Sequence, residues 1–153
     1  MAEFAGLAKA KGSMKKMIRV LVVDDHPVLR RGIKTILEKA EDIEVVGEAG
    51  DGRAALELVE ELPADVLLLD IEMPQMDGLE VAREINKNEM PIRILALSAY
   101  DDNEYVLGML ECGADGYLTK DEAPDLLVRA VRRVASGEAG WLSQRVYKRI
   151  SSA

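Results

Sequence analysis

Two kinds of segment alternate along this chain. Short segments rich in Val, Ile and Leu recur five times, and each is typical of a β-strand. They are Met17–Asp25, Ile43–Ala49, Ala64–Asp70, Ile92–Ala99 and Ala114–Lys120. The first, third and fourth are almost continuously apolar at their centres. That pattern indicates strands covered on both faces, as in a parallel sheet.

Helical patterns follow the strands, with apolar residues at three- and four-residue spacing. Continuous helices are expected over Pro27–Lys39, Asp51–Leu62 and about Glu122–Ala135. Asp77 and either Asp101 or Asp102 stand where an acidic side chain would cap two further helices. Gly137 marks the expected end of the last helix.

The order of elements is therefore five βα units. Right-handed crossovers between parallel strands place helices on both faces of one sheet. The sequence predicts an α/β protein with a flavodoxin-like (βα)5 doubly wound parallel sheet and strand order 2-1-3-4-5. In such a sheet the functional site lies outside the carboxyl ends of the strands.

Length, charge and cysteine content narrow the class of protein. The chain has 153 residues, enough for one domain with a core, and a formal net charge of -8 that argues against direct nucleic-acid binding. Its single cysteine, Cys112, excludes an internal disulfide and fits a reducing, cytoplasmic location. No apolar run approaches the ~18 residues of a membrane span. We therefore expect neither nucleic acid nor membrane as a direct partner.

The two ends of the chain differ in composition from the middle. Residues 1–16 read as a disordered leader or a cloning scar, and residues 17–137 as the folded domain. Residues 138–153 read as a C-terminal tail or the start of a linker, with apolar residues near helical spacing. Docking of this tail on the domain, docking on a partner, and disorder all remain open at this stage.

Polar side chains stand where the predicted strands end. Asp24 and Asp25 end the first strand, Asp70 the third, Ser98 the fourth and Lys120 the fifth. Parallel strands end at one sheet edge, so these groups are expected to converge. Two unit charges ~4 Å apart repel by about 4 kcal/mol at an effective dielectric constant of 20. Several carboxylates with room for water suit Mg²⁺, which would remove the repulsion.

This arrangement suits phosphoryl transfer. A carboxylate such as Asp70 can act as a nucleophile and form an acyl phosphate. Lys120 offers a charge and Ser98 a hydrogen-bond donor for phosphoryl oxygens. The alternatives without a functional role are that the Asp24–Asp25 pair only caps a helix, that Lys120 is a solvated surface lysine, and that Ser98 only makes a hydrogen bond at the strand end.

Four stretches carry a family resemblance. "VVDDHPVLRRGI", "DVLLLDIEMPQMDGLE", "ILALSAYDD" and "GADGYLTKDEAPDLLVRAV" resemble the receiver domain of bacterial two-component response regulators, over about Met17 to Gly137. "DDHPVLRRG", "VRRVASGEAGWLS" and the Lys120-Asp121 pair are similar to the NarL/FixJ (LuxR-type) subfamily. In that subfamily a helix-turn-helix DNA-binding domain follows the receiver. The residues after Gly137 are too few for one, so the chain reads as a receiver cut from a longer regulator or as a standalone receiver.

The resemblance implies roles for the acids. Asp70 would take a phosphoryl group from a cognate histidine kinase with Mg²⁺ as cofactor. Asp25 and Asp70 would bind the metal directly, Asp24 through water, and Glu72 by its backbone carbonyl. The chain would be a phosphoacceptor switch rather than an enzyme, assisting only its own phosphorylation and dephosphorylation.

The resemblance also implies how the signal spreads. Ser98 would be the switch hydroxyl, Lys120 the phosphate-binding lysine, and Tyr117 the aromatic that turns inward when the hydroxyl moves. The face made by the fourth helix, fifth strand and fifth helix of the predicted fold would change. We expect phosphorylation-dependent homodimers and control of transcription through a DNA-binding domain.

Other functions fit the residues less well. A haloacid-dehalogenase-type phosphohydrolase also uses a strand-end Asp with Mg²⁺, but needs a second Asp two residues later, where Glu72 stands. A dinucleotide-binding domain needs G-x-G-x-x-G after the first strand, which is absent. A receiver-like module that is never phosphorylated stays open. His26 reads as a helix-start residue, and Cys112 as a small buried filler.

Overall fold

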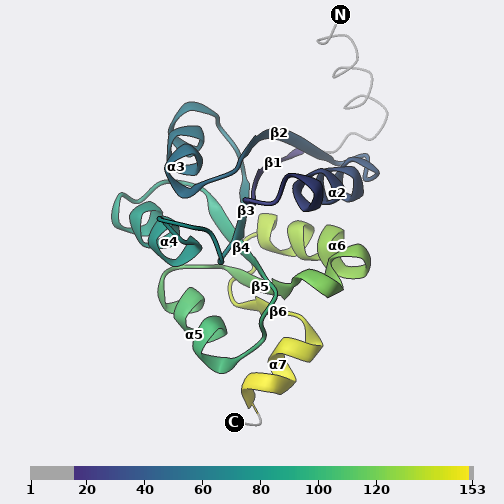
Figure 1. Cartoon of the computed structure of the whole chain (residues 1–153). Helices are drawn as coiled ribbons and strands as arrows, with labels where there is room; N and C mark the ends of the chain where they lie inside the picture. The colour runs from purple at the N-terminus through teal and green to yellow at the C-terminus, as the bar shows by residue number, and fades with distance from the viewer. Residues whose placement is uncertain (1–15, 152–153) are drawn as a thin grey trace, which may run out of the picture.

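A computed structural model describes residues 16–151, so the predicted leader lies outside the described residues except for Lys16. A six-stranded parallel sheet forms the centre of the molecule, in the order β2-β1-β3-β4-β5-β6 (Figure 1). The strands are β1 (Ile18–Val23), β2 (Ile43–Ala49), β3 (Val66–Asp70), β4 (Arg93–Ser98), β5 (Gly116–Thr119) and β6 (Trp141–Leu142). The predicted fold class and the order 2-1-3-4-5 are confirmed, and β6 is an addition at the edge.

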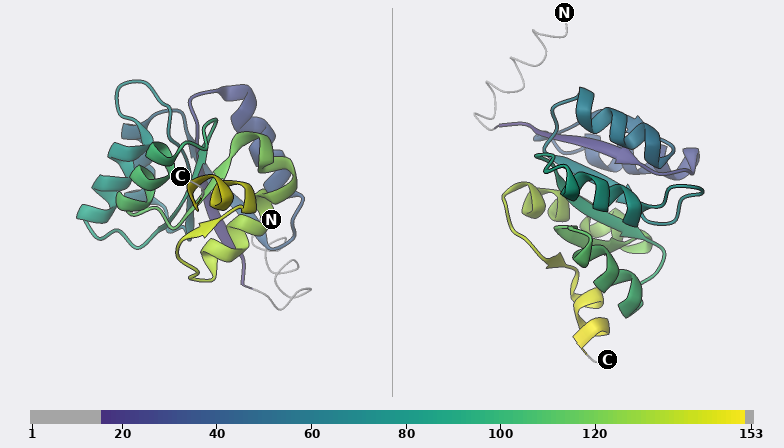
Figure 2. Two further views of the ribbon diagram at one scale, coloured as in Figure 1. Left: turned by 90° about the horizontal axis from the view of Figure 1, so that it is seen from below. Right: turned by 90° about the vertical axis from the view of Figure 1, so that its left-hand side faces the viewer.

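Helices cover both faces of this sheet. They are α2 (Pro27–Glu38), α3 (Gly52–Glu61), α4 (Gly78–Lys87), α5 (Asn103–Glu111), α6 (Ala123–Ala135) and α7 (Gln144–Ser151), with a 3-10 turn, η1 (Lys120–Glu122), before α6. Figures 1 and 2 show α2 and α6 together on one face and α3, α4 and α5 on the other. The molecule is therefore a three-layer sandwich.

Alternation along the central strands divides the core in two. In β3, Leu67 and Leu69 pack with the α3–α4–α5 layer, whereas Val66 and Leu68 pack with the α2–α6 layer. All four side chains are almost inaccessible to solvent. Successive strand residues point to opposite faces, so a continuously apolar strand requires a covered sheet.

The helix ends follow the expected chemistry with one exception. The Asp51 and Asp77 side chains cap α3 and α4, accepting hydrogen bonds from backbone amides three residues on. Asp102 occupies the N-cap of α5, but its side chain makes no capping hydrogen bond. The predicted N-cap position is therefore confirmed but the capping hydrogen bond is not formed, and the Asp102 carboxylate instead lies 3.3 Å from the Arg149 guanidinium.

The C-terminal residues dock on the domain. β6 pairs with β5 in parallel, with Trp141 opposite Gly116 and Leu142 opposite Tyr117. Val146 of α7 is fully buried in the same apolar cluster as Tyr117. Of the three alternatives left open for the tail, docking on the domain is the one observed for residues 141–151.

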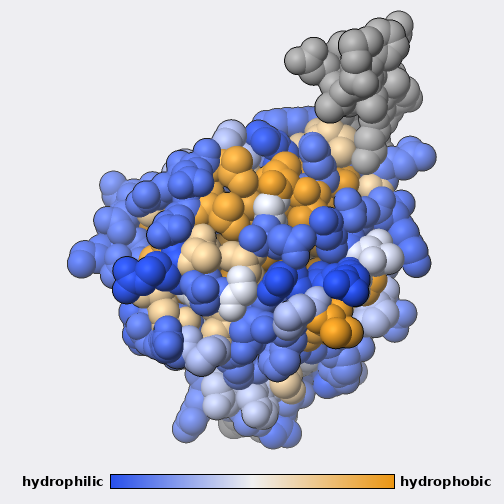
Figure 3. Space-filling view, turned by 45° about the horizontal axis from the view of Figure 1, so that its top comes forward, coloured by the Kyte–Doolittle hydropathy of each residue, from blue (hydrophilic) through white to orange (hydrophobic). Residues whose placement is uncertain are grey.

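The other edge of the sheet is more exposed. Figure 3 turns the β2 side toward the viewer and shows an apolar patch surrounded by hydrophilic side chains. Val45 and Val46 of β2 are only partly buried, which agrees with an edge strand. Among the described residues, none of the helices combines the length and the apolar content that crossing a membrane requires.

Candidate functional site

The carboxyl ends of β1 and β3 bring acidic groups together. Asp24, Asp25, His26 and Asp70 each offer one ligand atom, and these atoms all lie within 4.8 Å of one another. Asp24 and Asp70 are each only 1% exposed. A hydrogen bond from the backbone amide of His26 to Asp24 Oδ1 (2.8 Å) holds the first carboxylate at the start of α2.

Lys120 reaches the same acids from the end of β5. Its Nζ lies 3.1 Å from Asp70 Oδ1 and 3.6 Å from Asp24 Oδ2. Burial lowers the pKa of the Lys120 ammonium, but the charges of Asp70 and Asp24 outweigh burial and leave that pKa raised. Lys120 is therefore a fixed positive charge beside Asp70 at neutral pH.

The ionised form of the Asp70 carboxyl is destabilised despite the nearby Lys120 ammonium. Burial and then the charge of Asp24 raise the pKa of Asp70 from its ordinary 3.8 to about 7, against the opposing effect of Lys120. One ammonium is thus insufficient to balance the buried carboxylates. A group with a strongly shifted pKa, buried among charged partners, is typical of functional sites.

Two buried oxygens of these acids lack a hydrogen-bond partner and fit a cation. Asp24 Oδ2 and Asp70 Oδ2 are buried and have no hydrogen-bond partner among the described residues. Buried carboxylate oxygens normally find a donor or a metal. A set of hard oxygen ligands with open positions matches the preference of Mg²⁺. The residues present therefore fit a magnesium ion.

Gly78 lets the loop after β3 close tightly. A Cβ at this position would lie 2.6 Å from the backbone oxygen of Asp70 and 2.8 Å from Ile71 Cα. The Gly78 amide also donates a hydrogen bond to the Ile71 carbonyl (2.9 Å). A side chain at residue 78 would push the start of α4 away from the Asp70 backbone, so glycine is needed here for packing.

Ser98 at the end of β4 contacts Glu72. Its hydroxyl donates to Glu72 Oε2 (2.9 Å), and the Ala99 backbone amide donates to Glu72 Oε1 (3.2 Å). Only the backbone carbonyl of Glu72 was predicted from the sequence to be functional, so this side-chain contact was missed. It could not be read from the sequence, because residues 72 and 98 are brought together only by the pairing of β3 with β4.

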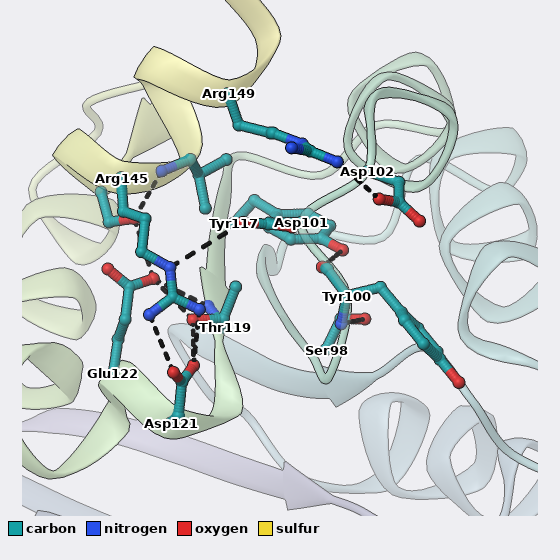
Figure 4. Close-up of polar contacts among 12 residues, drawn as sticks. Ser98, Tyr100, Asp101, Asp102, Tyr117, Thr119, Asp121, Glu122, Arg145 and Arg149 are labelled. Carbon is teal, nitrogen blue, oxygen red and sulfur yellow. Dashed lines mark hydrogen bonds and ion pairs between the residues drawn. The ribbon is translucent and has the colours of Figure 1, made fainter.

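Tyr117 already points inward. It is fully buried, and its hydroxyl donates a 2.6 Å hydrogen bond to the backbone oxygen of Tyr100, as the close-up of this region shows (Figure 4). Burial raises the pKa of the Tyr117 phenol, so it remains a donor at neutral pH. Tyr117 was expected to turn inward when the Ser98 hydroxyl moves, but it is inward here while that hydroxyl binds Glu72, so its role as a two-position switch stays a prediction.

Arg30 is a second residue that the sequence analysis missed. Its Nη1 donates to the backbone oxygen of Asp24 (2.6 Å), and its Nε donates to Glu48 Oε1 (2.9 Å). These bonds fix the backbone that carries the first acid. The helical spacing could have identified Arg30, because this residue lies about one turn after His26, the N-cap of α2.

Fold and site together define a class of protein. Residues 20–132 match the family model described as response regulator receiver domain. The match covers well over half of the chain, so the protein belongs to the response regulator receiver domain family. The family found is the one the sequence motifs resemble, and the phosphohydrolase and dinucleotide-binding alternatives find no support.

Curated relatives place the chain in the NarL group. It is 44% identical over 119 residues to the nitrate/nitrite response regulator protein NarL of Escherichia coli K12, covering 78% of this chain and 55% of that protein. It is 45% identical over 120 residues to the probable transcriptional regulatory protein NarL of Mycobacterium tuberculosis H37Rv, covering 78% and 56%. The chain spans about half the length of these relatives, and it is a receiver of the NarL (LuxR) type.

Solved structures agree with this placement. The receiver domain of the putative response regulator NarL from Mycobacterium tuberculosis superposes with a TM-score of 0.77 at 44% identity, covering 80% of this chain and 99% of that one. A LuxR-family response regulator from Aurantimonas sp. SI85-9A1 gives a TM-score of 0.84 at 31% identity, covering 90% and 97%. Structures of RcsB from Salmonella include a receiver domain with the phosphomimetic beryllofluoride (TM-score 0.80, 27% identity, coverage 88% and 99%).

Proposed function

We propose that Asp70 accepts a phosphoryl group from a histidine kinase and that the chain acts as a phosphorylation-controlled switch. The observation that carries the proposal is the placement of Asp70. Its buried carboxylate has one oxygen without a hydrogen-bond partner and the other 3.1 Å from Lys120 Nζ. Family membership supports the same reading, since receiver domains are generally phosphoacceptors.

The same acids would hold Mg²⁺. Asp25 and Asp70 would bind it by their carboxylates, Glu72 by its backbone carbonyl, and Asp24 through water. The ion would supply positive charge for the buried acids and for the oxygens of the incoming phosphoryl group.

The chain's own groups would then carry the transfer. A carboxylate oxygen of Asp70 attacks phosphorus in line, and the bond from phosphorus to the donor nitrogen or oxygen breaks with its electron pair. Lys120 stabilises the charge on the phosphoryl oxygens. Ser98 exchanges its bond with Glu72 for one with the phosphoryl group, because a dianionic acceptor binds a hydroxyl more strongly.

The consequence would be a change on the face formed by α5, β5 and α6. The loops that carry Ser98 and Lys120 border this face, so new charge at Asp70 would bias their arrangement. We expect phosphorylation to alter self-association and, in a full-length regulator, to control transcription. A kinase-controlled switch of this kind would work in the cytoplasm.

The direct test of the proposal is phosphorylation by a small donor. With acetyl phosphate and Mg²⁺, intact-mass analysis should find one added phosphoryl group, and size-exclusion chromatography of the same sample should report any change in self-association. Chelation of Mg²⁺ with EDTA should prevent the addition. A protein that stays unmodified under conditions that label a known receiver contradicts the proposal.

The Ser98–Glu72 bond leads to a separate prediction. Replacing Glu72 with alanine frees the Ser98 hydroxyl and the Ala99 amide and removes a negative charge from the path of an anionic donor. Since one such hydrogen bond contributes about 1 kcal/mol, phosphorylation by acetyl phosphate should be about two- to tenfold faster. Initial rates from intact-mass time courses measure this. The exposed Glu80→Ala change is the control, and equal rates for both variants argue against competition by Glu72.

A further inference from the structure

The C-terminal segment lies across the loop that follows Ser98 and the turn that begins at Lys120. We call residues 141–151, which include β6 and α7, the C-terminal clasp. Figure 4 shows side chains of the clasp pointing toward the loop after β4, which follows Ser98, and toward the turn after β5, which begins at Lys120.

Apolar contacts anchor the clasp on the domain. Val146 is fully buried, and Leu142 and Ile150 pack against the same cluster, which contains Tyr117. β6 also covers the outer edge of β5 through backbone pairing. The clasp therefore occupies part of the α5–β5 face from which a receiver would signal.

Charged contacts tie the clasp to the turn after β5. The Arg145 guanidinium binds Asp121 through two hydrogen bonds, of 2.8 and 3.1 Å. The Ser143 hydroxyl donates to Glu122 Oε1 (2.9 Å). Asp121 directly follows Lys120 in the chain, so this part of the clasp is coupled to the position of the Lys120 backbone.

A second set of charged contacts reaches the loop after β4. Arg145 Nε lies 3.8 Å from Asp101 Oδ2, and Arg149 Nη2 lies 3.3 Å from Asp102 Oδ1. Asp101 follows Ser98 by three residues. One arginine, Arg145, thus bridges the two loops whose separation would change when Ser98 and Lys120 are drawn to a phosphoryl group.

We propose that the clasp is an internal ligand of this face and that phosphorylation of Asp70 releases it. The inference rests on the proposed function of Asp70. In the docked state Ser98 is bound to Glu72, and the Arg145–Asp101 contact is already at the limit of an ion pair. Drawing Ser98 toward Asp70 moves the loop after β4 relative to Asp121, so Arg145 loses one of its two partners. A docked clasp would also exclude a second copy or another partner from the edge of β5.

Linkage makes the effect reciprocal. If binding of a phosphoryl group at Asp70 weakens clasp docking, then weakening the clasp must strengthen that binding by the same factor. Beryllofluoride with Mg²⁺ is a suitable probe, because it mimics the phosphoryl group reversibly and its affinity can be measured at equilibrium. The chain's single tryptophan, Trp141, lies within the clasp and provides a fluorescence signal for docking.

Hydrogen exchange of the whole chain tests release. Adding beryllofluoride and Mg²⁺ should speed amide exchange in residues 144–151 by about tenfold or more, because a helix this short is marginal once it leaves the domain. Exchange in β3, which is central and fully covered, should not accelerate. Unchanged or slower exchange in residues 144–151, with beryllofluoride shown to be bound, overturns the clasp proposal.

Variants test the reciprocal effect. Arg145→Gln combined with Arg149→Gln removes the arginine contacts but keeps the apolar anchors and the Ser143–Glu122 hydrogen bond, so the domain should still fold. This double variant should show faster exchange in α7 without ligand and bind beryllofluoride about fivefold more tightly. Arg132→Gln, which removes the ion pair between Arg132 of α6 and Asp42 directly before β2, is the matched control and should change neither quantity.

The outcomes separate the two proposals. If beryllofluoride does not bind the wild-type protein, both the phosphoacceptor role of Asp70 and the clasp proposal are overturned. If it binds but the affinity of the double variant equals that of the Arg132→Gln control, only the clasp proposal fails. Tighter binding with faster α7 exchange supports both.

Discussion

Replacing Asp70 with asparagine should abolish phosphoryl incorporation from acetyl phosphate and Mg²⁺. The amide is close to isosteric with the carboxylate but is a very poor nucleophile, and it withdraws one of the charges that would bind the metal. Asp70 is also the buried acid in contact with Lys120, at 3.1 Å. Intact-mass analysis after a fixed incubation should show full labelling of the wild-type chain and no phosphoryl group on the variant.

The control for this substitution is Asp125→Asn. Asp125 is exposed in the first turn of α6, so the change removes the same charge from a residue that is not part of the acidic cluster. It should leave labelling unchanged. Undiminished labelling of the Asp70 variant would show that another group accepts the phosphoryl, and the assignment of Asp70 would be wrong.

The same Asp70→Asn change should stabilise the folded protein near and above pH 7 when Mg²⁺ is absent. The pKa of Asp70 is raised to about 7 in the folded chain, chiefly by burial and by Asp24, from an ordinary value of 3.8. At a pH between these two pKa values, the Asp70 carboxyl is ionised in the unfolded chain and still protonated in the folded chain. Unfolding thus releases a proton, and stability falls as pH rises from about 4 to 7.

The size of this effect is large for one side chain. A pKa difference of that extent lowers the free energy of unfolding by roughly 4 kcal/mol. The full loss is reached at pH values above the pKa of Asp70 in the folded chain. Urea denaturation at pH 5 and pH 8 should show that the stability advantage of Asp70→Asn over wild type grows with pH. Mg²⁺ should shrink the difference at pH 8, because the ion binds only the folded wild-type acids. A pH-independent difference between the two proteins contradicts the proposed cause.

The loss of folding stability caused by the buried Asp70 carboxylate fits the proposed function. A site assembled from buried acids is unstable until positive charge arrives, so the proposed binding of a metal and a phosphoryl group would come at the expense of stability. Lys120 supplies part of that charge in the resting chain. The Glu72 carboxylate meanwhile accepts a hydrogen bond from the Ser98 hydroxyl, and under the proposed function this bond would distinguish the resting state from the phosphorylated one.

The sequence alone determined the fold and the convergence of the acids. Strands such as Val66–Asp70 are apolar at every position until their last, and only a sheet covered on both faces accommodates that pattern. Parallel strands end at one edge, so the positions of Asp24, Asp70 and Lys120 in the chain were enough to predict their meeting. The motifs around them were enough to predict the family. These features are local or follow from topology, which is why they can be read from the chain.

Only the tertiary structure decided the contacts between segments far apart in sequence. The bond from Ser98 to Glu72, the bond from Arg30 to the Asp24 backbone, and the docking of Val146 all depend on strand register and rotamer. The tail illustrates the reason: its helical spacing was visible, but whether α7 is bound or free depends on a complementary surface that other segments build. A periodic pattern specifies which face of a helix is apolar, and the assembled fold specifies what that face meets.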